Sequence, residues 1–543
     1  MHSKQETEVE ASSPLNGAAE KVYAYHERTK HHLDHFAAGP DSLDWDTQPN
    51  PYREFTGAPR ILLPLGARQL HTPFSALHQP HAVAGQPLSL PSIGILLELS
   101  FAISAWKTYG PDRWALRCNP SSGSLHPTEA YVVCSGMEGL GAGVYHYTSL
   151  EHALEKRVAI VEDGTFLLVG LSSIHWREAW KYGERAFRYC QLDLGHALGA
   201  LRYAAAALGW EARLVDASGT AQIAQLLGLN RPQDFAAAEA EEADCLIALT
   251  PLPAAMPQPQ GEWSGLANLL DRHPMYRWPV INEVADATHK AESSPVKQNE
   301  TQLATWPALM SKVDTRAAEL ILQRRSAQRF DGVTVMSAAD FYHMLDCLLP
   351  RELPPWDVWN FEPRVHPLLF VHRVEGVAPG IYILVRDPEA QERLLTALHA
   401  EFVWSRVAGA PEHLPLFLLQ ATDCVKAART LSCRQAIAGD SCFALGMLAE
   451  FADVVEASPW RYRQLHWEAG LLGQVLYLQA EAVGLRGTGI GCFFDDAFHE
   501  MLGLKDKRFQ SIYHFTVGRP LLDDRISTLP PYMERALTQA PIT

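Results

Sequence analysis

The hydrophobic positions of this chain form two long helical stretches and several shorter runs. Residues 188–208 and 463–483 are rich in Ala, Leu and Tyr at helical spacing, and each stretch is followed by a glycine, Gly209 or Gly484. A glycine there favours a left-handed C-terminal cap, so the pattern predicts two long buried helices. Short apolar runs predict strands over residues 131–134, 246–249, 367–371, 414–421 and 512–517. Helices and strands interspersed in this way indicate an α+β fold.

The two long helices belong to a segment that occurs twice. Residues 188–229 recur as residues 463–504 at a constant offset of 275 residues, without a gap. The identical pairs at that offset include Arg188/Arg463, Gly195/Gly470, Leu201/Leu476, Ala205/Ala480, Ala207/Ala482 and Gly209/Gly484. Upstream, His126-Pro127 and His366-Pro367 each precede an apolar strand. The chain therefore contains an internal duplication of a unit of about 200 residues, the size of an ordinary domain.

Changes in composition divide the chain into four parts. Residues 1–20 carry Ser, Glu and Ala with almost no apolar pattern, which is typical of disorder. Residues 21–250 hold the first unit with an N-terminal extension, and residues 308–543 hold the second. Residues 251–307 are rich in Pro, Gln, Asn and Glu, which predicts a linker with a short helix at Leu266 to Asp271.

Composition and charge argue against several kinds of partner. The net charge of −16 argues against nucleic acid or an anionic membrane surface. No apolar run reaches the ~18 residues of a membrane span, and the polar N-terminal residues do not resemble a signal peptide, so we expect a cytoplasmic protein. The nine cysteines include no CxxC pair, and His31 and His35 lack an acidic or cysteine ligand at matching spacing. We therefore expect no metal site.

Two segments of the second unit suggest binding chemistry. Residues 324–329, Arg-Arg-Ser-Ala-Gln-Arg, place three arginines and a serine at the end of a helix, which suits a phosphate. A solvated basic face is the alternative for this segment alone. Residues 487–491, Gly-Thr-Gly-Ile-Gly, follow the second long helix and would let backbone amides approach a flat ligand. They do not link a strand to a helix, so they are not a dinucleotide fingerprint.

The first unit carries a different polar segment. Residues 119–127 read Asn-Pro-Ser-Ser-Gly-Ser-Leu-His-Pro, which offers small side chains, exposed amides and hydroxyls. An ordinary turn is the alternative for this stretch taken by itself. Near the chain end, residues 517–520 read Val-Gly-Arg-Pro and Arg525 adds another cation.

These segments, in this order, resemble the nitroreductase superfamily of flavin enzymes. The resemblance is greatest to its azoline-dehydrogenase branch, the SagB/ThcOx-type (McbC-like) family. It implies two nitroreductase-like domains with FMN at their interface, packed here as an intramolecular pseudo-dimer. The segments that carry it are residues 25–31, 120–127, 181–189, 324–330, 469–470, 487–496 and 517–525. The FMN-binding residues that the resemblance implies are Pro120, Ser121, Ser122, Gly123, Arg324, Arg325, Ser326, Gly489, Ile490, Gly491 and Arg525.

Each unit lacks what the other has kept. The first unit has residues 77–82, Leu-His-Gln-Pro-His-Ala, in place of the arginine segment, and residues 212–216 in place of the glycine run. The second unit has residues 360–363, Asn-Phe-Glu-Pro, in place of Pro-Ser-Ser-Gly. We therefore expect one composite FMN site per chain and a mirror-image site that no longer binds.

The pair Lys181-Tyr182 also occurs only once, because the offset places Glu456-Ala457 in the second unit. The resemblance implies that this pair is catalytic. A lysine with a lowered pKa, or a tyrosine beside it, is a suitable base for the ring proton of a thiazoline or oxazoline. The alternative is an ordinary turn of a surface helix.

The sequence thus predicts an FMN-dependent oxidoreductase that oxidises azolines to azoles in a modified peptide, with a cyclodehydratase as a candidate partner. One alternative is an NAD(P)H-dependent nitro or quinone reductase acting on a small molecule. Another is a flavin-binding or scaffold subunit without turnover.

Overall fold

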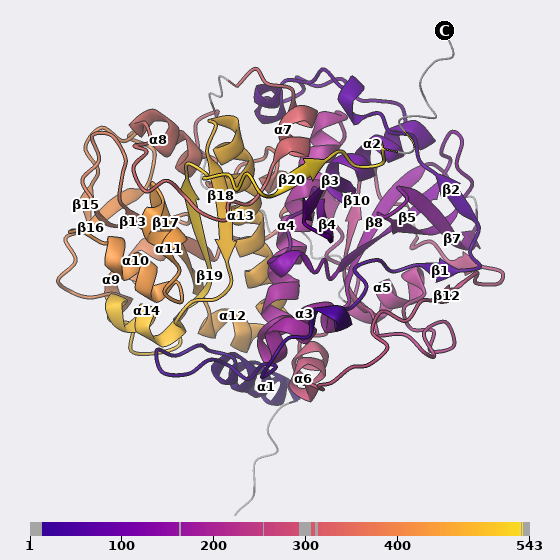
Figure 1. Ribbon diagram of the computed structural model, residues 1–543, viewed down its shortest axis with the longest axis horizontal. Helices are drawn as coiled ribbons and strands as arrows, with labels where there is room; N and C mark the ends of the chain where they lie inside the picture. Colours follow the sequence, from indigo (N-terminus) through magenta and orange to yellow (C-terminus); the bar gives the residue numbers. More distant parts are fainter. Residues whose placement is uncertain are drawn as a thin grey trace, which may run out of the picture.

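The two long helices predicted from the sequence lie side by side at the centre of the computed structural model (Figure 1). They are α4 (Ala186–Ala207) and α13 (Arg461–Ala482), each within two residues of its predicted bounds. Gly209 and Gly484 follow them with φ of 69° and 72°, so the predicted left-handed caps are confirmed. The structure describes residues 14–161, 164–253, 255–292, 306–309, 313–533 and 535.

Each repeat unit contains an antiparallel sheet. The strands of the first sheet are β2 (Arg60–Leu62), β5 (Thr128–Ser135), β6 (Gly143–Thr148), β7 (Ala153–Ile160), β8 (Phe166–Ser173), β9 (Arg213–Leu214), β10 (Glu242–Ala248) and β11 (Pro259–Gln260). Those of the second are β13 (Val365–Val371), β14 (Gly380–Leu384), β15 (Ser405–Arg406), β16 (Leu416–Ala421), β17 (Phe443–Glu450), β18 (Arg486–Ile490) and β19 (Phe509–Gly518). All five predicted strands are therefore confirmed in kind.

The duplication is visible in the strand order. The first sheet contains the path β6-β5-β8-β10-β9 and the second contains β14-β13-β17-β19-β18, which match strand for strand in chain order. Both units therefore have the same α+β topology, and they pack on each other as the predicted pseudo-dimer (Figure 1).

Helices cover both faces of the two sheets, and β5, β8, β17 and β19 are buried at every residue for that reason. The helices of the first unit besides α4 are α1 (Pro14–Arg28), α2 (Leu90–Ser100), α3 (His175–Tyr182), α5 (Thr220–Leu227) and α6 (Pro279–Ala287). Those of the second besides α13 are α7 (Ala317–Gln323), α8 (Ala338–Asp346), α9 (Ala390–Ala397), α10 (Val425–Leu431), α11 (Ala436–Asp440), α12 (Ala452–Ala457) and α14 (Asp495–Leu502).

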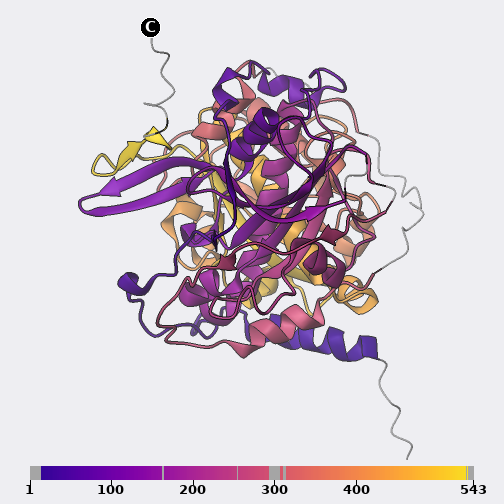
Figure 2. The same cartoon turned by 90° about the vertical axis from the view of Figure 1, so that its right-hand side faces the viewer.

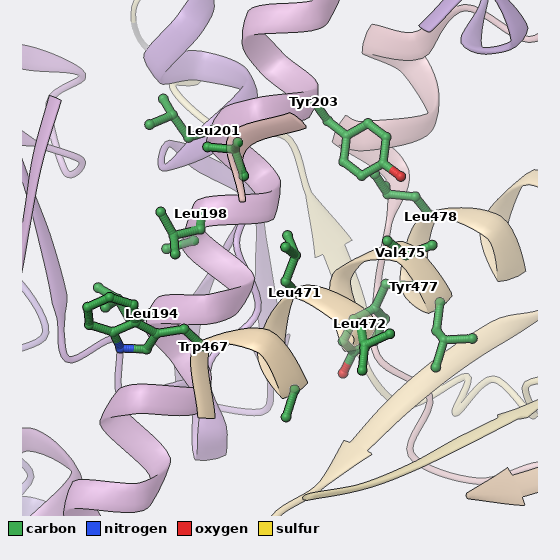
Figure 3. Close-up of a cluster of buried hydrophobic side chains, with 14 of the residues drawn as sticks. Leu194, Leu198, Leu201, Tyr203, Trp467, Leu471, Leu472, Val475, Tyr477 and Leu478 are labelled. Carbon is green, nitrogen blue, oxygen red and sulfur yellow. The ribbon is translucent and has the colours of Figure 1, made fainter. Parts of the chain in front are cut away.

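One hydrophobic core runs through both units, and α4 and α13 form its centre. Figure 3 shows Leu194 of α4 beside Trp467 of α13, and Leu198, Leu201 and Leu471 belong to the same buried cluster. Smaller apolar clusters cover the outer faces, with α5 on the first sheet and α9, α10 and α14 on the second. The shared core means that neither unit buries its central helix alone.

Two glycines bring the central helices into backbone contact. A Cβ atom on Gly195 would lie 2.2 Å from the Trp467 carbonyl oxygen, and one on Gly470 would lie 2.1 Å from the Leu192 carbonyl oxygen. These separations are too short for any side chain. The repeated glycine of the sequence pattern is therefore a packing requirement of the α4–α13 interface.

The two ends of the chain each reach across to the other unit. The Tyr23 hydroxyl on α1 donates to the Ala452 carbonyl oxygen of α12 at 3.2 Å. Near the other end, β20 (Ser527–Leu529) pairs with β3 (Ile103–Tyr109), which forms a hairpin with β4 (Asp112–Arg117). Figure 2 shows this hairpin projecting from the body with the yellow C-terminal strand beside it.

Three predictions about flexible segments need correction. Of residues 1–20, which we expected to be disordered, residues 1–13 lie outside the described residues and the rest belong to α1. The short helix predicted at Leu266 to Asp271 is wrong, because Leu266–Ala267 is strand β12, paired with β1 (Phe55–Thr56). The predicted linker instead contains helix α6, whose Ile281, Val284 and Ala285 are buried in the common core, so hydrophobic packing overrides its polar composition there.

The helix interface yields a stability prediction. Gly195→Ala should lower the free energy of unfolding, because overpacking against backbone costs about 1–3 kcal/mol and exceeds the helix-propensity gain of about 1 kcal/mol. Denaturant titration would measure the difference. Gly17→Ala in α1 is the matched control, since a Cβ there meets nothing within 4 Å; it should leave stability unchanged or slightly raised. Equal stability of both variants would contradict a close-packed interface.

Candidate functional site

A cavity of about 750 Å³ lies between the two units and is lined by both. The first unit contributes the segment around Ser121 and Ser122 with Asp193 and His196 of α4, and the second contributes the arginine segment with parts of α13 and β18. Of the residues predicted to bind a cofactor, those that line this cavity are Pro120, Ser121, Ser122, Gly123, Arg324, Arg325, Ser326, Gly489 and Gly491. The fold therefore brings together the segments that each unit kept.

One end of the cavity is strongly cationic. Lys107, Arg324, Arg325 and Arg486 all line it. The guanidinium of Arg324 is buried and donates only to the carbonyl oxygens of Arg117 and Cys118, both at 3.2 Å, while its Nη1 has no hydrogen-bond partner. Neither Arg324 nor Arg325 has an acidic group within 4.0 Å among the described residues. Burial, with Arg324 beside it, lowers the pKa of Arg325 to about 10. Such uncompensated cations favour an anionic ligand.

The arginine segment is held in place by β18 and α13. The Ala327 amide donates to the Gly487 carbonyl oxygen at 3.1 Å, and the Thr488 hydroxyl donates to the Ala327 carbonyl oxygen at 2.6 Å. The hydroxyls of Ser326 and Tyr477 are 2.9 Å apart. The sequence predicted a loop for the glycine run, but it forms the edge strand β18, because its backbone completes the hydrogen-bond ladder of β19.

The glycines of residues 487–491 are required for packing inside the protein, whereas the sequence pattern predicted that they make room for a ligand. A Cβ atom on Gly489 would lie 1.7 Å from the Tyr513 hydroxyl, and one on Gly491 would lie 1.9 Å from the Tyr189 ring. The space beside each glycine is thus filled by a tyrosine of the protein. Both residues still border the cavity, so a bound ligand would meet a flat backbone edge supported by aromatic rings.

Two buried carboxyl groups lie under the serine turn of the first unit. The amide of Ser122 donates to both oxygens of Asp193 at 3.1 Å, and its hydroxyl donates to one of them at 3.1 Å. The Ser121 hydroxyl lies 3.5 Å from Glu178, whose Oε2 is buried without a partner. Burial raises the pKa of Asp193 to about 7 and, together with Asp193, that of Glu178 well above its usual value. We therefore expect at least one of the two to be protonated near neutral pH.

Lys181 and Tyr182 lie behind Gly123, at the edge of the cavity. A Cβ atom on Gly123 would lie 2.7 Å from the Tyr182 hydroxyl and 3.0 Å from Lys181 Nζ. Gly123 has φ of 61°, and it lines the cavity. Lys181 and Tyr182 do not line the cavity themselves, but the missing side chain at Gly123 lets their polar ends pack against the turn that does. Burial lowers the pKa of Lys181 and raises that of Tyr182 well above its usual value.

Two predicted cofactor residues lie away from the cavity. The exposed side chain of Arg525 pairs with Asp523 at 2.7 Å and is not part of the lining. Ile490 is the last residue of β18 and lies between Gly489 and Gly491, and its side chain is buried in the outer apolar core. Sequence reasoning missed Lys107, Arg486 and Asp193. Arg486 could have been found because it precedes the glycine run, whereas Lys107 reaches the cavity only through the β3–β4 hairpin.

The mirror position holds a second cavity, of about 720 Å³, with a different charge arrangement. Its walls come from residues 76–83 and 209–213 of the first unit and residues 351–361 of the second. Here Arg202, which the repeat places at the position of Tyr477, makes two hydrogen bonds of 2.7 Å to Asp357. Its cations therefore already have acidic partners within the protein, as Arg351 does with Asp346 at 2.5 Å. This geometry supports the expectation that the mirror site does not bind a phosphate.

The histidine pair of the N-terminal extension does not form a ligand set. His31 Nδ1 accepts the Ala37 amide at 3.0 Å, and the His35 ring stacks on His32. Within the described ranges, no group of three or more potential metal ligands is found. In the same part of the chain, no helix is both long and apolar enough to cross a membrane.

Comparison with known proteins supports the fold interpretation. Residues 381–519 match the Nitroreductase family model. The whole chain superimposes on a crystal structure from Anabaena variabilis that is described as a nitroreductase, with a TM-score of 0.66 and 21% identity over 92% of this chain and 99% of that one. The matched residues lie in the second unit, and the chain as a whole has the fold of that nitroreductase structure.

A curated relative is similar to part of this chain. The trifolitoxin-processing protein TfxB of Rhizobium leguminosarum bv. trifolii is 30% identical over 156 residues, which is 25% of this chain and 42% of that protein. The match therefore spans less than half the length of that relative, and it leaves the activity of the whole protein to be argued from the site.

The buried carboxyl groups beside the cavity yield a pH prediction. Because the pKa of Asp193 is raised to about 7 in the fold, the folded state binds more protons than the unfolded state above pH ~4, so this residue's contribution to stability falls as pH rises to about 7. Asp193→Asn has no carboxyl group to titrate at this position, so the variant does not lose this stability as pH rises. Its stability relative to the wild type should therefore rise between pH 4 and 7 and then level off, by on the order of 1 to 4 kcal/mol.

Thermal unfolding at a series of pH values would measure this difference. The exposed Asp41→Asn controls for the loss of one carboxylate from the net charge. A difference between Asp193→Asn and the wild type that stays flat with pH would show that Asp193 is ionised throughout the range.

Proposed function

We propose that the protein is an FMN-dependent oxidoreductase that dehydrogenates azoline rings to azoles in a modified peptide. One observation carries the proposal: a single cavity joins the buried cations of the second unit to the serine turn of the first, with the Lys181–Tyr182 pair directly behind that turn. A peptide substrate and a cyclodehydratase partner are parts of the same proposal.

The cationic end of the cavity fits the phosphate of FMN. Arg324 is buried and Arg325 is partly buried, neither has an acidic group within 4.0 Å among the described residues, and Arg324 Nη1 lacks any hydrogen-bond acceptor. A phosphate oxygen would supply that acceptor and would lower the cost of burying both charges. Lys107 and Arg486 stand at the same end and would add to the positive potential.

The opposite wall fits a proton-transfer role. Bound FMN would accept the hydride equivalent that leaves a substrate carbon. Lys181 would take the accompanying ring proton on its Nζ atom, because burial lowers its pKa and so favours the neutral amine. Tyr182 keeps its phenolic proton, since burial raises its pKa, and its hydroxyl can therefore donate a hydrogen bond to the substrate ring.

The azoline assignment rests on similarity as well as geometry. The motif resemblance includes the Lys181-Tyr182 pair, and the curated relative is named for processing trifolitoxin. The site adds that both side chains are partly buried and lie against Gly123, which argues against an ordinary surface helix turn.

The composite site predicts how much FMN the chain binds. The wild-type chain should release about one FMN per chain on denaturation, because only one of the two cavities has cations without acidic partners.

Arg325→Ala should lower FMN affinity roughly tenfold to a hundredfold, since it removes a charge-assisted contact worth about 1.5–3 kcal/mol. Fluorescence titration of apoprotein with FMN would measure both quantities. Arg525→Ala is the matched control and should bind as the wild type does, because Arg525 lies outside the cavity lining. A stoichiometry near two would contradict the composite site.

Anaerobic reduction tests the chemistry itself. Holoprotein mixed with a synthetic azoline peptide should lose the absorbance of oxidised flavin and yield the azole. Lys181→Ala should keep its bound FMN and its thermal stability but react about 10²–10⁴ times more slowly, as expected for a lost general base. Lys156→Ala is the control. Lys156 is also partly buried, but it lies on β7 of the first unit, and its loss should leave the rate at the wild-type value.

The same experiment separates the alternatives. Bleaching by NAD(P)H but not by the azoline would identify a reductase for nitro compounds or quinones. Absence of bleaching by either reagent would leave a flavin-binding scaffold. Normal azoline oxidation by Lys181→Ala would remove the main structural support for this assignment.

A further inference from the structure

Two of the nine cysteines differ from all the others in their surroundings. Seven cysteines are buried, whereas Cys433 and Cys492 are partly exposed. These two are far apart in the sequence, but the fold brings their segments together, since Gln435 Nε2 donates to the Cys492 carbonyl oxygen, and their thiols lie close enough to interact. No disulfide joins them in the structure, which contains both as free thiols. The two partly exposed thiols of the chain are therefore neighbours in the fold.

The local backbone holds the two thiols together. Cys433 follows α10, and Cys492 lies between β18 and α14. The Phe494 amide donates to the Leu431 carbonyl oxygen at 2.8 Å, and Gln435 Nε2 donates to the Cys492 carbonyl oxygen at 3.4 Å. Cys433 has φ of 51°, a left-handed backbone that non-glycine residues seldom adopt. The α10–α11 turn is thus fixed against the end of β18 in a conformation that the surrounding contacts maintain.

The charges around the pair favour a reactive thiolate on Cys492. The interaction with the Cys433 thiol is the main cause that lowers the pKa of Cys492; burial opposes it, and the nearby Arg185 guanidinium adds to it. The same interaction raises the pKa of Cys433. Arg185 is held beside the pair, since it donates to the Gly491 carbonyl oxygen at 3.2 Å and to Asp495 at 3.0 Å. A thiolate with a resolving thiol beside it is the arrangement that oxidants select.

The pair adjoins the wall of the candidate cavity. Gly491, the residue before Cys492, lines that cavity and packs against the Tyr189 ring. Tyr189 in turn packs on Tyr182, with ring centroids 4.3 Å apart. The dithiol therefore lies within two packed side chains of the proposed catalytic pair.

We propose that Cys433 and Cys492 form a redox-active dithiol, which hydrogen peroxide converts to a reversible disulfide at the edge of the flavin cavity. The Cys492 thiolate attacks one peroxide oxygen, so that an S–O bond forms, the O–O bond breaks and hydroxide leaves. Cys433 then attacks the resulting sulfenic sulfur, and an S–S bond forms as the S–O bond breaks. In total, two thiols lose two electrons and two protons, and one peroxide becomes two waters.

The source of peroxide rests on the proposed function, because O₂ that takes two electrons from a reduced flavin leaves as hydrogen peroxide. The dithiol itself does not depend on azoline chemistry. Peroxide added directly tests it even if the substrate assignment fails.

The test is to treat purified full-length holoprotein with hydrogen peroxide, block remaining thiols with N-ethylmaleimide and map peptides by mass spectrometry without reductant. The wild type should lose two reactive thiols and the mass of two hydrogen atoms, and should give a cross-linked peptide pair that contains Cys433 and Cys492. Dithiothreitol should restore both thiols. Oxidation without this cross-link, or a cross-link to a different cysteine, would overturn the proposal.

Three variants keep the test independent of folding defects. Cys433→Ser lacks the resolving thiol, so Cys492 should stop at sulfenic acid and react with dimedone. Cys492→Ser lacks the proposed nucleophile, and Cys433 should then react more slowly than Cys492 does in Cys433→Ser, since burial still raises the pKa of Cys433 and Arg185 is held next to residue 491. Cys442→Ser changes a buried cysteine of the same unit and should form the cross-link as the wild type does. Equal reactivity of the single remaining thiol in Cys433→Ser and Cys492→Ser would also overturn the assignment of roles.

Discussion

The close approach of α4 and α13 is the constraint on which the rest of the structure depends. Gly195 and Gly470 lie backbone to backbone, so the two central helices pack at a distance that no side chain would permit. The same helices carry Asp193 and His196 on one side and Tyr477 on the other, and all three line the candidate cavity. The spacing of the helices therefore sets the distance between the two walls of the site.

Duplication followed by divergence explains why two cavities of similar size have different chemistry. Both lie between the same elements of the two units, with volumes of about 750 and 720 Å³. In one, Arg324 is buried without an acidic group within 4.0 Å among the described residues; in the other, Arg202 is neutralised by Asp357. Covalent linkage of the units removes the need for identical halves. Each unit can then keep one half of a site and use the other half for interface packing.

Burial gives the candidate site its electrostatic character. Desolvation lowers the pKa values of Lys181 and Arg325 and raises those of Glu178 and Asp193. Buried basic and buried acidic groups both lower the stability of the fold when no partner compensates their charge. Here both occur around one cavity. Such concentrations of perturbed groups are typical of functional sites, where stability is given up for chemistry.

The sequence by itself determined the α+β class, the duplication, both central helices with their caps, and the segments that form the site, because these depend on local periodicity and on residue types that suit a ligand. Only the tertiary structure decided that Arg525 lies outside the cavity, that Lys107 and Arg486 belong to it, and that Leu266–Ala267 pairs as a strand. It also showed that Gly489 and Gly491 make room for Tyr513 and Tyr189. The physical reason is the same in each case. Contacts between residues far apart in the sequence decide which side chains share a cavity, and such contacts leave no periodic pattern along the chain.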